Sequence, residues 1–198
     1  MNNCGFSEAE AKQIEANYHE LYKESDAWLE ARLKQASKDG YATAAFGLRV
    51  RCPLLQQVVW GSQSIPFEAQ AESRTLGNAI SGQSYGLLNN RSSVEFRDRT
   101  LASKYRLDVL PIALIHDAAY MLVRDDLNIV HWVNENLPDC MQWQDLPELQ
   151  HPNIKLGGEV DIHYGSWAYP VTIPNNSTKE QFLNICKTKA EEFKSKTT

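Results

Sequence analysis

His116 and Asp117 are the residues best placed to do chemistry, because they interrupt two apolar runs. The runs, Val109 to Ile115 and Ala118 to Val123, have the length and composition of buried β-strands, so we predict a β-hairpin with an acid at its tip. A carboxylate near a core loses hydration that hydrogen bonds, cations or a metal ion must replace. Asp117 is therefore a candidate metal ligand, although aspartate also favours turns for purely structural reasons.

Other patterns of metal-binding residues are weaker. Metal-dependent phosphohydrolases also use an adjacent His-Asp pair, but they need further histidines that converge from helices. The remaining histidines, His19, His131, His151 and His163, do not follow such a pattern. The cysteines, Cys4, Cys52, Cys140 and Cys186, are far apart and form no C-x-x-C pair. We therefore predict neither a zinc site nor a disulfide.

The elements expected before the hairpin are mostly helical. Ser7 and Glu10 form a capping box that opens one long amphipathic helix, and Gly40 is the expected helix stop. Residues 41–55 are expected to form a hairpin or two short strands. Between Glu68 and Asn89 the glycines at 77, 82 and 86 favour two short helices or one broken helix, and a separate polar helix is expected from Val94 to Tyr105.

After the hairpin, Asp125 and Asp126 can cap a helix that Pro138 ends. Ile154 to Tyr164 is expected to be another strand. Ser177 and Glu180 form a second capping box, which opens a C-terminal helix that ends near Phe193.

Composition sets broad limits. The 198 residues are 42% hydrophobic, enough for one domain with a core, and the net charge of −5 argues against a surface that lies wholly on nucleic acid. Between Arg91 and Arg106 basic residues outnumber acidic ones, so this stretch could face a phosphate backbone or simply solvent. No apolar run approaches the roughly 20 residues of a membrane-spanning helix, and the first residues do not resemble a signal peptide. We expect a cytoplasmic protein without membrane partners.

The segment from Ala113 to Ala118 resembles motif C of family A DNA polymerases, in which a His-Asp pair usually precedes a glutamate; here Ala118 takes that place. Upstream, Arg74, Asn78 and Gln83 are similar to the family's arginine, asparagine and glutamine that touch the terminal base pair, with Gln83 one residue late. Gly47 to Pro53, with Arg49 and Arg51, is similar to the stretch that follows the long helix. Gly165 to Trp167 resembles the glycine-x-tryptophan near the C-terminus.

These segments occur in the family's order between Gly5 and Trp167. The resemblance implies an α+β fold, the C-terminal part of a polymerase palm, with a motif C hairpin packed against helices. Its parts would be a long helix at 1–40, the palm at 41–175 and a C-terminal helix at 176–198. Ala118 and the C-terminal extension look more like the polymerases of bacteriophages than the bacterial repair enzymes.

The resemblance also implies roles for single residues. Asp117 would ligate a pair of Mg²⁺ ions, and His116 would contact the primer terminus. Arg74, Asn78 and Gln83 would reach the minor groove of primer-template DNA, where donors test pair shape without reading sequence. Arg49 and Arg51 are further candidate DNA contacts.

Two parts of the family pattern are missing from the sequence. No segment resembles motif A, which supplies the second metal-binding aspartate, and the fingers helix that holds the incoming dNTP is absent. We therefore expect a split polymerase whose larger subunit carries exonuclease, thumb, fingers and motif A. Alternatives are a non-catalytic DNA-binding accessory protein, the palm of a single-subunit RNA polymerase, and a plain globular interaction protein.

Overall fold

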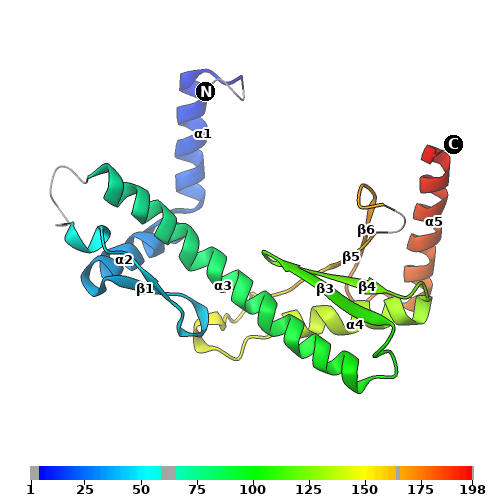
Figure 1. Ribbon diagram of the computed structural model, residues 1–198. Helices are drawn as coiled ribbons and strands as arrows, with labels where there is room; N and C mark the ends of the chain where they lie inside the picture. Colours follow the sequence, from blue (N-terminus) through cyan, green and yellow to red (C-terminus); the bar gives the residue numbers. More distant parts are fainter. Residues whose placement is uncertain (1–4, 59–65, 164–165, 198) are drawn as a thin grey trace. The chain divides into compact units, whose positions relative to one another are not determined.

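The computed structural model describes residues 5–58, 66–163 and 166–197. It consists of two compact units, Met1–Ser84 and Tyr85–Thr198, which we describe separately (Figure 1). The predicted α+β class is confirmed, because the described residues form α-helices and three two-stranded antiparallel sheets. The predicted palm and the segments 1–40, 41–175 and 176–198 stay a prediction. None of the described helices combines the length and apolar character that a bilayer-spanning segment requires.

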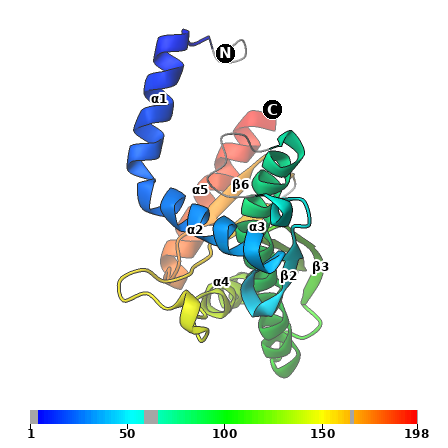
Figure 2. The same cartoon turned by 90° about the vertical axis from the view of Figure 1, so that its left-hand side faces the viewer.

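The first unit begins with two helices where one was predicted. They are α1 (Glu8–Leu21) and α2 (Lys23–Asp39), and Tyr22 with φ −107° and ψ 19° separates them. The predicted capping box is confirmed, since Ser7 and Glu10 bind each other's backbone N–H. The change of direction after α1 is visible in Figure 2. None of the residues of α1 is buried, so no packing within the unit holds the two helices in line.

α2 packs on a small hairpin. Its strands are β1 (Tyr41–Thr43) and β2 (Arg49–Arg51), joined through the 3₁₀ turn η1 (Ala45–Gly47), and a second turn, η2 (Leu55–Gln57), follows. The two short strands are therefore confirmed. Gly40 ends α2 in the left-handed region at φ 79°, as expected. Around it, Ala36, Cys52, Leu55 and Leu76 form the core of this unit.

α3 (Phe67–Ala102) is one continuous helix of 36 residues. The prediction of a broken helix followed by a separate one was therefore wrong. A glycine inside a helix costs only about 1 kcal/mol relative to alanine, which packing can offset. Gly77 illustrates this, because a Cβ at this position would lie 3.3 Å from Cδ1 of Leu29 on α2. The glycine allows close approach of two helices and does not break one.

The second unit is built on the predicted hairpin. β3 (Val109–Ile115) pairs with β4 (Ala118–Val123), as expected. α4 (Leu127–Met141) follows, capped by the side chain of Asp126, which accepts from two backbone N–H groups. Pro138 lies inside α4, so the prediction that it ends the helix was wrong by one turn. Apolar side chains from all these elements form the core, including Phe96, Val109, Ile129, Val133 and Leu137.

The chain ends with η3 (Pro147–Leu149), the hairpin of β5 (Val160–His163) and β6 (Pro170–Ile173), and α5 (Lys179–Thr197). The strand predicted from Ile154 begins only at Val160, Tyr164 lies outside the described residues, and β6 was not predicted. The cap of α5 is also shifted by one residue. Thr178 and Gln181 bind each other's backbone N–H, whereas the Ser177 hydroxyl donates to the carbonyl oxygen of Pro174 at 2.6 Å.

Candidate functional site at the tip of the β3–β4 hairpin

The turn that carries the two predicted catalytic residues is tight. Ile115 pairs with Ala118, so His116 and Asp117 alone form the loop. His116 has φ 54° and Asp117 does not have a positive φ, so the loop lacks the second positive φ of a type I′ turn. Glycine is preferred where φ is positive. Histidine tolerates the left-handed region better than most residues, but at some cost in strain.

Asp117 is exposed at the tip, and no described residue forms a hydrogen bond or ion pair with its carboxylate. From the sequence we expected that the Asp117 carboxylate would lose hydration and need a partner to replace it. In this chain the carboxylate is exposed to solvent, so that argument does not apply. Its exposure leaves the carboxylate accessible to a ligand from outside the chain.

Asn89 on α3 contacts this turn, and the sequence analysis did not identify it. Its Nδ2 donates to the backbone carbonyl oxygen of His116 at 3.4 Å, and Asn89 is only 5% exposed. One turn earlier on α3, a Cβ at Gly86 would lie 3.9 Å from the same oxygen. No local signal could have identified Asn89, since the contact joins residues 27 positions apart.

A groove of about 850 Å³ runs from this turn along β4. Its walls include every residue of Ala118–Val123 and the continuous stretch 156–163. Residues of α3 and α4 contribute most of the rest, and Ile112, Asp125 and Trp167 also line it. β4 pairs only with β3, and β5 only with β6, among the described strands, so each of the two has an unpaired edge. The groove lies along β4 and β5, with Asp117 in its lining.

Aromatic side chains lie beside this groove. Tyr120 of β4 stacks on Trp167 with ring centroids 5.2 Å apart, and His163 lies 6.1 Å from the same tryptophan ring. Trp167 belongs to the predicted glycine-x-tryptophan segment, of which Gly165 lies outside the described residues. The stack connects β4 to the segment between β5 and β6.

The predicted minor-groove residues are all exposed on α3. Arg74 and Asn78 are four residues apart and share one helix face. Gln83 is turned about 140° from Asn78, since each residue of a helix advances about 100°. The helix therefore brings the first two together and leaves Gln83 on another face.

Arg49 and Arg51 project from β2, both exposed and on the same face, because alternate residues of a strand point the same way. The Arg49 guanidinium lies 4.5 Å from the ring centroid of Tyr41 on the paired strand. Val50 between them packs against the core of the first unit.

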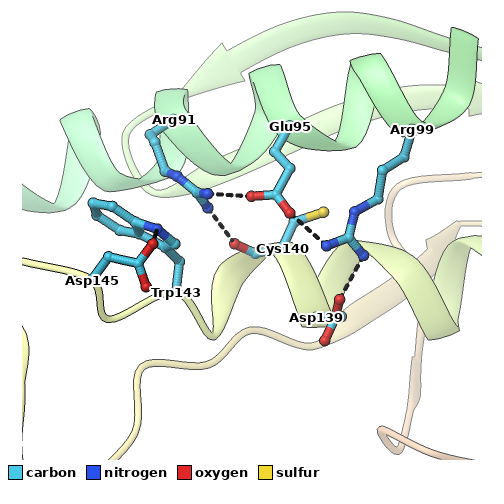
Figure 3. Close-up of polar contacts among 7 residues, drawn as sticks. All are labelled: Arg91, Glu95, Arg99, Asp139, Cys140, Trp143 and Asp145. Atoms are coloured by element: carbon cyan, nitrogen blue, oxygen red, sulfur yellow. Dashed lines mark hydrogen bonds and ion pairs between the residues drawn. The ribbon is translucent and has the colours of Figure 1, made fainter.

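Three of the five basic residues between Arg91 and Arg106 are paired with neighbouring acids. Figure 3 shows Glu95 between Arg91 and Arg99, with an ion pair to each, and Arg99 also pairs with Asp139 of α4 at 2.5 Å. Those partners, Asp139 first, raise the pKa of Arg99.

Further contacts occupy the same stretch. Arg91 donates to the carbonyl oxygen of Cys140 at 3.1 Å and stacks over the ring of Trp143, and Arg97 pairs with Asp98. A phosphate backbone would have to compete with carboxylates for these arginines. Their contacts join α3 to α4 and indicate a structural role.

No group of three or more His, Cys, Asp or Glu side chains is arranged to hold a metal ion in the described ranges. Asp117 fits a metal as a single carboxylate ligand, and a complete set of ligands would need groups from outside those ranges. No protein-family model matches the chain, and no curated protein matches it either.

Proposed function

We propose that this chain is the C-terminal palm subunit of a template-directed DNA polymerase similar to family A, and that a second chain completes its active site. The observation that carries the proposal is Asp117 at the tip of a tight hairpin, exposed and without a side-chain partner among the described residues. A rigid hairpin suits a metal ligand, since ligand geometry must hold to within about 0.5 Å.

The groove beside β4 supports the need for a second chain. Two strand edges with unpaired backbone groups accept an added strand through main-chain hydrogen bonds. The six residues of β4 span about 20 Å, so the added strand would have about six residues. Because Asp117 contributes to the lining, a strand from the partner could deliver its own acid beside that carboxylate.

Exposed apolar side chains on the hairpin also support a second chain. Leu110, Ile112 and Leu114 of β3 are 50%, 56% and 47% exposed, and Leu122, the partner of Leu110 on β4, is 61% exposed. The register shifts at Ile112, which places Leu110 and Leu114 on opposite faces of the hairpin, so apolar side chains are exposed on both faces. Exposed apolar side chains gathered on one element are typical of a protein interface. The larger subunit, with exonuclease, thumb, fingers and motif A, is the partner that this proposal requires.

In this scheme Asp117 ligates Mg²⁺ together with an acid of the partner. A pair of Mg²⁺ ions bound between these acids would stabilise the attacking and leaving oxygens in phosphoryl transfer. His116 lies next to Asp117 in the turn, where its side chain would contact the primer terminus. Arg74 and Asn78, on one face of α3, would contact the minor groove of the primer-template, and Gln83 would act from a different face.

The test is primer extension by the assembled protein. The tagged chain is isolated from the cells that contain it, with any polypeptide that co-purifies, and supplied with primer-template, dNTPs and Mg²⁺. We expect extension that Asp117→Ala lowers by about a thousandfold or more, as for loss of a metal ligand. Glu180→Ala, which removes an exposed acid of α5 that does not line the groove, is the control and should retain activity.

Each alternative function gives a different result. Extension that survives Asp117→Ala would refute the metal assignment. Salt-dependent binding of primer-template without Mg²⁺ dependence or extension indicates the non-catalytic accessory protein, for which the alanine at position 118 is the supporting observation. Extension with ribonucleotides instead of dNTPs indicates an RNA polymerase.

A further inference from the structure

The peptide between His116 and Asp117 determines where the Asp117 carboxylate points. A type II′ turn and a type I′ turn differ mainly by a flip of this central peptide, which reverses the sign of φ at the second loop residue. Asp117 has a non-positive φ, so its peptide is not in the type I′ orientation. Hairpins adopt both turn types, and therefore the turn by itself does not select one orientation.

Asn89 holds the atom that would move in such a flip. Its Nδ2 donates to the carbonyl oxygen of His116 at 3.4 Å. That oxygen reverses direction when the peptide flips, and the hydrogen bond would be lost. The donor comes from the interior of α3, a continuous helix of 36 residues, so the bond anchors the turn to this helix.

Asn89 is a poor choice for stability alone. It is buried, and its Oδ1 has no hydrogen-bond partner among the described residues. An unsatisfied buried acceptor costs stability, whereas an apolar side chain of similar size at the same place would not. In return for the unsatisfied Oδ1, the Asn89 side chain makes one hydrogen bond, from Nδ2 to the carbonyl oxygen of His116.

We propose that Asn89 is a positioning residue, which holds the His116–Asp117 peptide in one orientation and so aims the Asp117 carboxylate. The catalytic consequence depends on the proposed polymerase function, but the conformational one does not. Asn89→Leu removes the donor and also the unsatisfied acceptor while keeping the size of the side chain. The turn should then sample both orientations although the fold remains.

Asn134 provides a matched control. It is 1% exposed, its Nδ2 donates to the carbonyl oxygen of Pro174 at 3.3 Å, and its Oδ1 also has no partner among the described residues. Asn134→Leu therefore makes the same chemical change at a buried position that does not contact the turn. A general effect of replacing a buried asparagine would appear in both variants.

The first measurement is NMR of the full-length chain. Backbone couplings and carbon shifts of His116 and Asp117 report the orientation of their peptide. We expect one conformer in the wild type and in Asn134→Leu, and a second conformer with positive φ at Asp117 in Asn89→Leu. Unchanged couplings in Asn89→Leu would overturn the proposal, whatever the protein does as an enzyme. If that variant does not fold, Asn89→Ala tests the same bond.

The second measurement is primer extension in the assembled complex. Asn89→Leu should lower kcat by about ten- to a hundredfold and raise the Mg²⁺ concentration for half-maximal activity, as loss of a group that orients a metal ligand does. KM for dNTP and the thermal midpoint should stay near those of Asn134→Leu. If Asp117→Ala abolishes extension and Asn89→Leu changes neither kcat nor the Mg²⁺ requirement, the positioning role is wrong while the proposed function stands.

Discussion

Tyr120 and Trp167 stack with their rings 16° from parallel and their centroids 5.2 Å apart. One residue lies in the middle of β4 and the other between β5 and β6, so the pair joins two hairpins that share no strand pairing among the described residues. It therefore bridges the groove that begins at Asp117.

We expect this stack to contribute measurably to the stability of the second unit. In a double-mutant cycle of Tyr120→Leu and Trp167→Leu, the coupling free energy should be about 0.5–1.5 kcal/mol, the range of aromatic pairs beyond their area burial. Chemical denaturation of the four proteins measures it. A cycle of Tyr120→Leu with Tyr105→Leu is the control, because Tyr105 packs on Trp132 instead, and additive free energies are expected there. Additivity in the first cycle would show that the stack does not hold the hairpins together.

Glu95 should matter more for stability than other acids of α3. It pairs with Arg91 and Arg99, and its side chain is 28% exposed. Glu95→Gln leaves two guanidinium groups without their shared partner, so we expect a loss of about 1–3 kcal/mol in the free energy of unfolding. Asp98→Asn breaks the exposed pair with Arg97 and should cost less than about 1 kcal/mol. Equal losses in denaturant titrations would contradict the structural role of the Glu95 network.

Relief of backbone strain at the turn should raise stability while it lowers activity. His116→Gly removes the cost of φ 54°, and we expect a gain of about 1 kcal/mol in the free energy of unfolding. In the assembled complex the same variant should lower primer extension, because it lacks the imidazole expected to contact the primer terminus. Asn176→Gly, at φ 60° in the loop before α5, should change neither much, since asparagine tolerates this conformation well. A His116→Gly protein of unchanged stability would show that the turn is not strained.

Short-range signals account for what the sequence predicted correctly. The Ser7–Glu10 box, the helix stop at Gly40 and the β3–β4 hairpin each depend on residues a few positions apart. The position of Asp117 followed from such a pattern, because two apolar runs around two polar residues leave little choice of turn. The palm assignment depends on the resemblance and stays a prediction.

The features that the sequence did not reveal depend on packing between distant segments. α3 continues through Gly77, where Leu29 of α2 occupies the space that a side chain would need. Thr178 displaces Ser177 as the cap of α5, since the Ser177 hydroxyl is committed to Pro174 and its carbonyl oxygen to His131. The contact of Asn89 with the turn also depends on packing between distant segments, and it comes from a helix that the sequence suggested was broken.

Stability should depend on pH in the alkaline range through Cys140. Burial raises the pKa of this thiol to about 11. Because the folded protein holds the proton more tightly than the unfolded chain, stability is full below the ordinary pKa near 9.0 and falls as pH rises toward 11. The slope contributed by one thiol is at most about 1.4 kcal/mol per pH unit. Denaturant titrations between pH 8 and pH 11 should find a shallower decline in Cys140→Ala than in the wild type, and parallel curves would contradict the assignment.

The two side-chain caps that the sequence predicted correctly should differ in their effect on global stability. Asp126 caps α4, which buries seven residues including Ile129, Val133 and Leu137, so Asp126→Ala should cost about 1 kcal/mol in the free energy of unfolding. Ser7 caps α1, which buries none of its residues, and fraying of that helix leaves both cores intact. Ser7→Ala should therefore lower helix content in circular dichroism and change the unfolding midpoint little. If Ser7→Ala lowered the midpoint as much as Asp126→Ala does, α1 would have to contribute to the cooperative core, contrary to its exposure in the isolated chain.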